Sequence, residues 1–179
     1  MLVIRLLTPR DWHVLRKTRL TALRESPGTF LAEYRNEKTF NNGKWRTEFE
    51  RGDWYVGVTE TNPDDKPIGM LGITREPTTP DYECFLEYLW VAPEHRCRGI
   101  ASEMLNQVLG RLKRSGIRTV FLWVLDGNDG AMRLYKRLGF VSCNVRQPLE
   151  GRPGRSEELM RLNLGWLRSR RCASPPVGT

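Results

Sequence analysis

Between Val91 and Ser102 the chain reads Val-Ala-Pro-Glu-His-Arg-Cys-Arg-Gly-Ile-Ala-Ser. An apolar run typical of a buried strand ends at the proline, a basic turn containing Gly99 follows, and an amphipathic helix pattern begins at once. The first N–H groups of a helix have no partners within it, and the helix dipole is positive at this end. This turn can therefore bind a phosphate group.

The residues of the turn suit an anion. Gly99 and Ala101 are small enough for the backbone to approach a ligand closely, and Arg96 adds positive charge, as does Arg98. The turn is not the dinucleotide fingerprint, which needs three glycines, and no Gly-Lys-Ser/Thr follows as in a phosphate-binding P-loop. A strand, turn and helix with one glycine can also be a plain connector, so the turn alone does not decide the function.

A second patterned segment, from Asn128 to Phe140, reads Asn-Asp-Gly-Ala-Met-Arg-Leu-Tyr-Lys-Arg-Leu-Gly-Phe. It resembles the N-x-x-A-x-x-x-Y-x-x-x-G-F segment of the GNAT superfamily (Gcn5-related N-acetyltransferases). The sequence Arg-Cys-Arg-Gly-Ile-Ala from Arg96 to Ala101 is similar to the R/Q-x-x-G-x-G/A motif of the same family. Both motifs occur in the family's order and spacing, and with their strands they cover about residues 83–141.

The flanking elements also fit this resemblance, from residue 2 to residue 164. Hydrophobic periodicity predicts strands at 2–7, 54–59, 68–74, 84–91, 119–125, 140–146 and 158–164. It predicts helices from a Thr8 cap to about 24, then at 36–51, 99–115 and 128–138, and a hairpin turn at 62–65. We expect one mixed α/β domain over 1–166, with six to seven strands flanked by about four helices, and a basic, disordered tail at 167–179.

The resemblance implies acetyl-CoA as cosubstrate. In the family, the strands that correspond to 84–91 and 119–125 splay apart at the cofactor cleft, and pantetheine lies between them. The main-chain groups implied to pair with the pantetheine amides are those of Leu89, Trp90 and Val91. The turn residues implied to hold the pyrophosphate, through N–H groups and flanking charge, are Arg96, Cys97, Arg98, Gly99, Ile100, Ala101 and Ser102. A backbone N–H near Leu89–Val91 would polarise the thioester carbonyl.

Two side chains of the second motif are candidates for contact with the cosubstrate. Tyr135 lies seven residues after Asn128, about two helical turns, so both residues share one helix face. The Tyr135 hydroxyl could protonate the departing CoA thiolate as general acid. An aromatic core residue is the alternative reading of Tyr135. Asn128 can cap its helix and also bond the pantetheine arm, and the cap alone would explain it.

The acceptor amine must lose a proton, because a lysine-type amine titrates near pH 10.4. Glu87 lies two residues before Leu89, so a regular strand would project both to one face and place a carboxylate near the thioester. A solvated strand charge is the alternative reading. Some family members place a glutamate five residues before the asparagine, where this chain has Trp123, so that version of the base is in doubt.

Composition bears on whether the protein binds a metal, spans a membrane or binds nucleic acid. The four cysteines form no C-x-x-C pair and the chain has two histidines, so we expect reduced thiols and no metal site. No apolar run is long enough for a membrane span and no signal peptide is evident, so we expect a cytoplasmic protein. The formal charge is +8, with six arginines against two glutamates after residue 150. Nucleic-acid binding through this end is the less favoured alternative.

The sequence therefore predicts an N-acetyltransferase of the GNAT type, in which an amine attacks bound acetyl-CoA directly in a ternary complex. A domain that senses acyl-CoA without turnover is the alternative. No cysteine occupies a clear nucleophile position, which disfavours a covalent acetyl-enzyme. The acceptor is a primary amine on a small molecule, peptide or protein that the sequence does not identify. The oligomeric state stays open, and a homodimer is one option.

Overall fold

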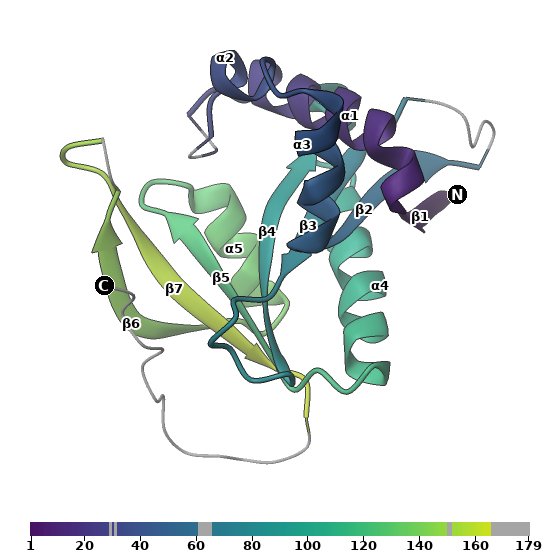
Figure 1. Cartoon of the computed structure of the whole chain (residues 1–179). Coiled ribbons are helices and arrows are strands. Elements are labelled where there is room, and N and C mark those ends of the chain that lie inside the picture. The colour runs from purple at the N-terminus through teal and green to yellow at the C-terminus, as the bar shows by residue number, and fades with distance from the viewer. Residues whose placement is uncertain (29, 31, 61–65, 150–151, 166–179) are drawn as a thin grey trace. The chain divides into compact units, whose positions relative to one another are not determined.

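Seven strands form a mixed sheet in the computed structural model (Figure 1). They are β1 (Leu2–Leu6), β2 (Gly52–Thr59), β3 (Gly69–Thr74), β4 (Glu83–Val91), β5 (Thr119–Leu125), β6 (Val141–Pro148) and β7 (Ser156–Asn163). Their order is β1-β2-β3-β4-β5-β7-β6. β4 and β5 pair in parallel, whereas β1 with β2, β2 with β3, β5 with β7 and β6 with β7 pair antiparallel. The predicted mixed sheet is confirmed.

The helices are α1 (Trp12–Glu25), α2 (Tyr34–Glu37), α3 (Asn42–Thr47), α4 (Ile100–Arg114) and α5 (Asp129–Arg137). Short 3₁₀ turns are η1 (Pro9–Asp11), η2 (Glu48–Glu50) and η3 (Pro93–His95). The structure describes residues 1–28, 30, 32–60, 66–149 and 152–165. The predicted hairpin turn at 62–65 and the predicted tail at 167–179 lie outside the described residues, and the domain boundary at 166 stays a prediction.

The contacts within the chain define two compact units. The first comprises Met1–Thr74 and Leu86–Val108, and the second comprises Arg75–Phe85 and Leu109–Thr179. Two of the three boundaries fall inside regular elements, because β4 and α4 each begin in one unit and end in the other.

The start of α1 confirms the predicted cap. The backbone N–H and the hydroxyl of Thr8 donate to Asp11 Oδ2 at 2.9 and 2.8 Å, and Pro9 occupies the first helical position. A single 3₁₀ turn, η1, precedes the α-helix itself. The hydrogen bond from the Thr8 backbone lowers the pKa of Asp11, since it favours the charged carboxylate.

The helix predicted at 36–51 is instead divided into α2, α3 and η2. α2 ends at Glu37, and Asn41 starts the second piece, because its side-chain Oδ1 accepts the Lys44 N–H at 2.8 Å. An asparagine that satisfies a free N–H in this way is a helix cap and not a helix interior residue. The division matters for function, since α2, α3 and η2 each contribute a side chain to the pocket described below.

The core of the first unit lies where α1 and α3 pack on the strands. Its buried members include Leu15, Ala22 and Leu23 of α1, Trp45 of α3, Trp54 and Val56 of β2, Met70 of β3 and Trp90 of β4. The sequence predicts Trp12, Leu15, Leu20 and Leu23 among the buried residues of this helix. In the structure Trp12 and Leu20 are only half-buried, whereas Arg19 is 3% exposed. A buried arginine needs a partner, and this one has Glu37.

The second unit centres on β5. This strand pairs antiparallel with β7 along its whole length, from Thr119↔Asn163 to Leu125↔Glu157, and parallel with the start of β4 from Glu83↔Thr119 to Phe85↔Phe121. The near-continuous apolar run from Thr119 to Leu125 predicts a strand that is buried on both faces. Instead its burial alternates from Thr119 to Val124, with Val120, Leu122 and Val124 buried and the residues between them half-buried. α5 contributes Leu134 and Tyr135 to the core of this unit.

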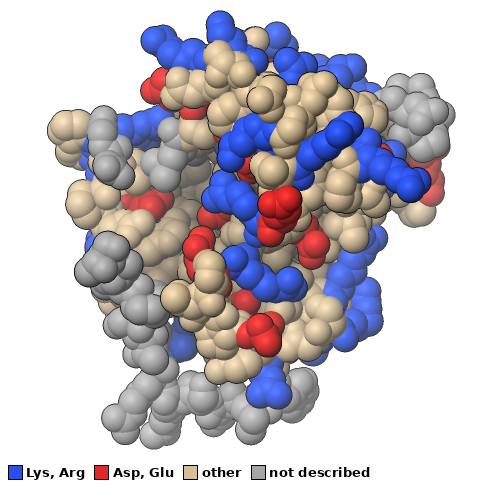
Figure 2. Space-filling view, in the orientation of Figure 1, with Lys and Arg blue, Asp and Glu red and all other residues tan. Residues whose placement is uncertain are grey.

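Three features bear on the classes of protein considered above: the length of the helices, possible metal ligands and the surface charge. Within the described part of the chain, no helix combines the length and apolar character that a membrane span requires. The same residues contain no group of three or more His, Cys, Asp or Glu side chains that could hold a metal ion. Figure 2 shows Lys and Arg over much of one face, interspersed with Asp and Glu.

Candidate active site

The turn after β4 folds as a tight bend with two left-handed residues. η3 follows the strand, and the His95 N–H donates to the Ala92 carbonyl at 2.8 Å. Cys97 and Gly99 then take positive φ angles of 59° and 79° before α4 begins at Ile100. A left-handed residue is unfavourable for most side chains, so a cysteine in this conformation points to a constrained turn.

The start of α4 presents backbone donors without a side-chain cap. Its first helical bond runs from the Glu103 N–H to the Gly99 carbonyl at 3.0 Å. The N–H groups of Ile100, Ala101 and Ser102 have no acceptor in the described part of the chain. A Cβ added to Gly99 would meet no atom within 4 Å, so the backbone here faces open space. These are the features of an anion-binding helix start.

Arg96 holds the turn in place. Its Nε donates to the Val91 carbonyl at 2.9 Å, and its Nη2 donates to Ser26 Oγ at 2.8 Å. The guanidinium therefore ties the end of β4 to the residue that follows α1. Arg98 is exposed and brings positive charge to the same turn.

β4 is irregular beside this turn. Tyr88 has a φ of 58°, which interrupts the extended backbone between Glu87 and Leu89. The alternation of buried and half-buried residues along the strand stops at Leu86 and resumes with two buried residues, Trp90 and Val91. The regular alternation from which we placed Glu87 and Leu89 on one face is thus absent here.

Glu87 and Tyr88 interact with each other at this irregular part of β4. Burial raises the pKa of Tyr88 to about 12, and the negative charge of Glu87 and a hydrogen bond to its side chain add to the effect. The positive charges of Arg19 and Arg51 oppose the shift. Tyr88 is therefore a neutral hydroxyl at ordinary pH, beside the carboxylate that we considered as general base.

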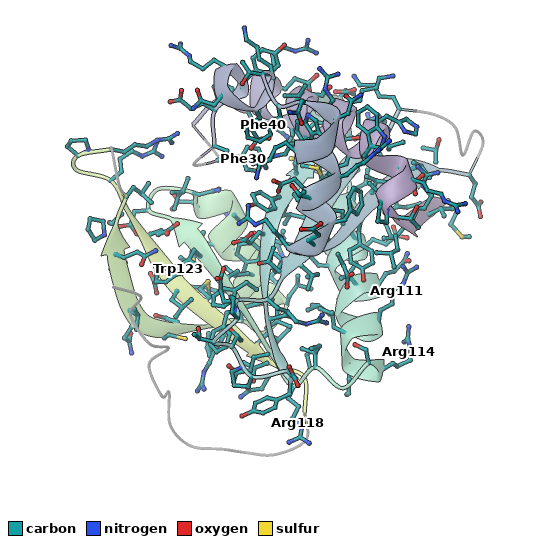
Figure 3. All side chains as sticks on the ribbon, viewed as in Figure 1. Phe30, Phe40, Arg111, Arg114, Arg118 and Trp123 are labelled. Carbon is teal, nitrogen blue, oxygen red and sulfur yellow. The ribbon has the colours of Figure 1, made fainter. Side chains whose placement is uncertain are left out.

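The second unit carries Asn128 and Tyr135. Asn128 caps α5 as predicted, because its Oδ1 accepts the Ala131 N–H at 3.2 Å. Tyr135 is 7% exposed, and its ring packs against Phe140 with centroids 5.7 Å apart. Burial raises the pKa of Tyr135, so its hydroxyl keeps its proton at ordinary pH. Trp123 lies on β5 opposite Leu159 (Figure 3).

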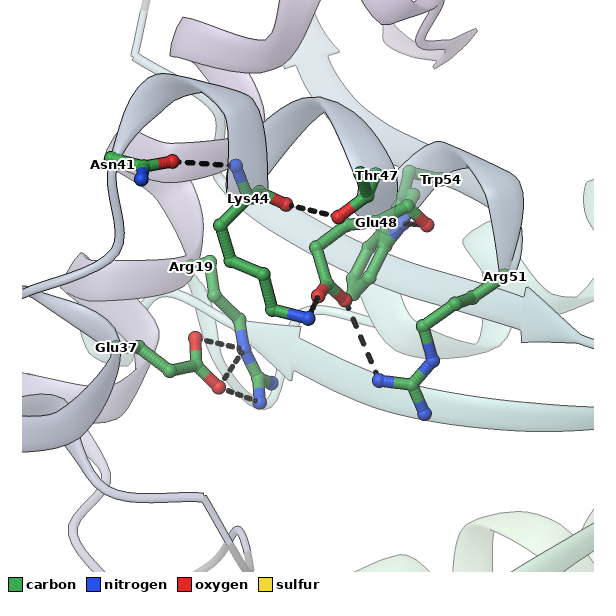
Figure 4. Close-up of polar contacts among 8 residues, drawn as sticks. All are labelled: Arg19, Glu37, Asn41, Lys44, Thr47, Glu48, Arg51 and Trp54. Atoms are coloured by element: carbon green, nitrogen blue, oxygen red, sulfur yellow. Dashed lines mark hydrogen bonds and ion pairs between the residues drawn. The ribbon is translucent and has the colours of Figure 1, made fainter.

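A pocket of about 180 Å³ in the first unit was not predicted. Its charged lining residues are Arg19, Glu37, Lys44, Glu48 and Arg51. Arg19 donates to both oxygens of Glu37, from Nη2 at 2.8 Å and from Nε at 3.0 Å (Figure 4). Glu48 lies 3.5 Å from Lys44 Nζ and 3.6 Å from Arg51 Nη1.

Four aromatic rings and Ala32 form the rest of the pocket lining. The aromatic residues are Phe40, Trp45, Trp54 and Tyr88. Trp54 stacks on Tyr88 with centroids 4.9 Å apart, and Gly72 leaves room for this stack, because a Cβ there would lie 2.9 Å from Tyr88 Cδ2.

The resemblance to the GNAT superfamily implies that Trp12, Phe30, Tyr34 and Trp45 lie on the acceptor side, and that one or two of them could line an amine pocket. Of these four aromatics, Trp45 lines the pocket. Trp12, Phe30 and Tyr34 are not among its lining residues and pack against the core instead. One sequence signal could have indicated the pocket. Arg19 stands four residues after Leu15 and three before Ala22, so a cation interrupts an apolar helix face.

Comparison with known proteins places the chain in a family. The sequence profile of the Acetyltransferase (GNAT) family matches residues 16–140. An uncharacterized N-acetyltransferase of Methanocaldococcus jannaschii is 44% identical over 110 residues, which are 57% of this chain and 45% of that protein. The N-alpha-acetyltransferase RimI of Mycobacterium tuberculosis is 34% identical over 80 residues, 45% of this chain and 49% of RimI. The alignments thus span about half the length of these two relatives.

A solved structure extends the likeness to the fold. The Salmonella typhimurium protein yncA, determined with its cofactor acetyl-CoA, superposes with a TM-score of 0.69 and covers 99% of each chain at 16% identity. At this identity the match concerns the fold alone. The profile match covers well over half of the sequence and contains both motifs. The chain therefore belongs to the acetyltransferase (GNAT) family.

Proposed function

We propose that the protein transfers the acetyl group of acetyl-CoA to a primary amine by direct attack in a ternary complex. The observation that carries this proposal is the start of α4, where uncapped N–H groups face open space beside Arg98. Backbone donors at a helix start complement a diphosphate. The N–H groups from Cys97 to Ser102 hold the CoA diphosphate, and Arg96 positions the turn by bonding the Val91 carbonyl.

The reaction needs one carbonyl activator, one base and one acid. The amine nitrogen attacks the thioester carbonyl carbon, so that a C–N bond forms and the C–S bond breaks. A backbone N–H of the segment Leu89–Val91 stabilises the oxyanion, and main-chain groups of this segment bond the pantetheine amides. Glu87 takes the amine proton, directly or through water, and Tyr135 protonates the CoA thiolate. The side-chain amide of Asn128 donates to the pantetheine arm.

Tyr135 keeps its proton at ordinary pH, which its proposed role as the acid requires. A tyrosine that stays protonated can donate to a thiolate that forms during the reaction, and its burial keeps it from exchanging that proton with bulk water. Its neighbour Phe140 fixes the ring by packing, which would survive removal of the hydroxyl. Tyr135→Phe is therefore the informative change.

The test is thiol release from acetyl-CoA across a panel of primary amines, with calorimetry of acetyl-CoA binding in parallel. We expect Tyr135→Phe to slow turnover by about 10² to 10⁴-fold with acetyl-CoA affinity nearly intact. Equal losses of rate and affinity would contradict the acid assignment. A protein that binds acetyl-CoA and releases no thiol with any amine would instead be a sensing domain.

A further inference from the structure

The pocket of the first unit has an imbalance of charge. Of its five charged lining residues, three are cations and two are carboxylates. Both carboxylates already have cationic partners, Glu37 in a bidentate pair with Arg19 and Glu48 between Lys44 and Arg51 (Figure 4). An ammonium group entering the pocket would therefore have to compete with these ion pairs for a carboxylate, whereas an anion would meet excess positive charge.

The hydrogen bonds of the pocket residues show the same imbalance. Arg19 Nη1 and Trp45 Nε1 are buried and have no partner among the described residues. Native proteins satisfy nearly all buried N–H groups, so an unsatisfied donor indicates a missing water, ion or ligand. Both side chains line the pocket, and both atoms are donors only. What these residues lack is an acceptor oxygen.

Arg19 is held rigidly for such a contact. Its guanidinium lies 4.2 Å from the centroid of the Tyr88 ring and 5.2 Å from that of Phe30, while Glu37 fixes its plane. A planar, preoriented guanidinium suits a carboxylate better than a single charged point does. The Trp54–Tyr88 stack adds apolar surface for the body of a ligand.

The size and position of the pocket limit the ligand further. A cavity of about 150 Å³ holds one benzene molecule, so about 180 Å³ accommodates one ring or a short aliphatic chain. Tyr88 lines the pocket and is flanked along β4 by Glu87 and Leu89, the segment proposed above to take the amine proton and bind pantetheine. A molecule with its amine at that segment would place its other end in the pocket.

We infer that the acceptor is a small primary amine that also carries a carboxylate, of the amino-acid type, whose carboxylate and apolar body occupy this pocket. This inference rests on the proposed acetyl transfer. It assigns Arg19, Lys44 and Trp45 to recognition of the carboxylate end, and it excludes polyamines and other acceptors whose second functional group is cationic.

The first experiment compares matched acceptors on the full chain. Phenylalanine, phenylalaninamide and phenethylamine share a ring and an amine, and only the first has a carboxylate. We expect kcat/KM for phenylalanine to exceed that for both others by at least about tenfold, the effect of one charge-assisted contact. Equal or faster acetylation of phenethylamine would overturn the inference and leave the proposed acetyl transfer standing.

The second experiment needs no turnover. Fluorescence of Trp45 and Trp54 reports binding of 3-phenylpropionate or of phenethylamine to the protein alone. We expect 3-phenylpropionate to bind more tightly than phenethylamine. The double variant Arg19→Gln/Glu37→Gln should lose this preference. Both residues are changed together so that neither partner of the buried ion pair is left charged without the other. Tighter binding of phenethylamine would overturn the inference even if acetyl transfer failed for other reasons.

Two variants guard against misfolding. Lys44 is half-exposed, so Lys44→Gln should fold normally and weaken 3-phenylpropionate binding by a smaller factor. Exposed Lys113 on α4 is the matched control, and Lys113→Gln should change neither ligand's binding. If Lys44→Gln and Lys113→Gln bind 3-phenylpropionate equally well, Lys44 has no part in recognition and this assignment is wrong.

Discussion

Two strands of the sheet, β4 and β5, are each followed by a glycine-containing turn and a helix. The two junctions differ in the residue at the helix cap. Gly99 precedes α4 with a φ of 79°, and Gly127 precedes the α5 cap with a φ of 85°. A Cβ added to either glycine would meet no atom within 4 Å. At α5 the Asn128 side chain accepts the Ala131 N–H, whereas Gly99 has no side chain with which to cap α4.

The charges at the two junctions differ in the same sense. Asp126 and Asp129 flank the start of α5, whereas Arg96 and Arg98 precede α4. An acidic, capped helix start has little affinity for an anion, and a basic, uncapped one attracts it. Backbone geometry alone thus does not make an anion site. The cap and the flanking charge decide which junction can take the diphosphate.

The largest expected effect comes from giving α4 the kind of cap that α5 has. Asp tolerates a left-handed backbone better than most residues, so Gly99→Asp should fold and place a carboxylate at the open donors. We expect acetyl-CoA affinity to fall by about 100-fold, since charge-assisted hydrogen bonds are lost and repulsion is added. Gly116→Asp, with a φ of 94° at the opposite end of α4, is the control and should leave affinity unchanged.

A smaller effect should follow from removing one charge beside each helix. Arg98→Gln should weaken acetyl-CoA binding by about threefold to tenfold, and the difference should shrink as salt rises because the residue is exposed. Arg133→Gln, on the exposed side of α5, should have no such effect. Titrations at two salt concentrations measure both. A salt-independent loss for Arg98→Gln would argue against an electrostatic contact.

The cap of α5 separates structural from binding roles. Asn128→Ala should lower the free energy of unfolding by about 1 kcal/mol, measured by urea denaturation, because the Ala131 N–H loses its acceptor. Asn128→Asp keeps the acceptor oxygen and loses the amide donor. If the amide also bonds pantetheine, the Asp variant retains stability and binds acetyl-CoA more weakly. Unchanged affinity in the Asp variant would leave Asn128 with the cap alone.

The smallest effect concerns a third helix start, that of η1 and α1. The Asp11 pKa is lowered from its ordinary 3.8, so its contribution to stability is present above that value and is lost as the pH falls through the folded-state pKa. Asp11→Asn should therefore destabilise the protein by about 0.5 kcal/mol at pH 7. Thermal unfolding should show the two proteins converging below pH 3.8. A difference that persists there would have another cause.

The fold was largely predictable because its signals are local. Hydrophobic periodicity marked all seven strands, and caps such as Thr8 and Asn128 marked two helix starts. The division of the second helix at Asn41 was visible only as an interruption, because a cap and a tolerated helix residue look alike without the Lys44 hydrogen bond. Alternate residues of β5 are half-buried because of what packs on each face of the strand. The apolar sequence of this strand alone does not indicate those contacts.

The site was less predictable because it depends on distant contacts. The sequence of β4 does not reveal the positive φ of Tyr88. The prediction that Glu87 and Leu89 share one strand face assumed a regular strand, so it could not anticipate this irregularity. Arg96 read as charge for the phosphate, but it bonds Ser26, which is 70 residues away in sequence. The pocket joins residues from α1 to β4, and Arg19 became meaningful only once Glu37 was seen beside it.

Calorimetry with two ligands and the Gly99→Asp variant tests the central claim most directly. Acetyl-CoA carries the diphosphate and S-acetylpantetheine does not. The intact protein should bind acetyl-CoA far more tightly than S-acetylpantetheine, and Gly99→Asp should abolish most of that difference while leaving S-acetylpantetheine binding unchanged. If Gly99→Asp weakens both ligands by the same factor, or neither, the uncapped start of α4 does not hold the diphosphate.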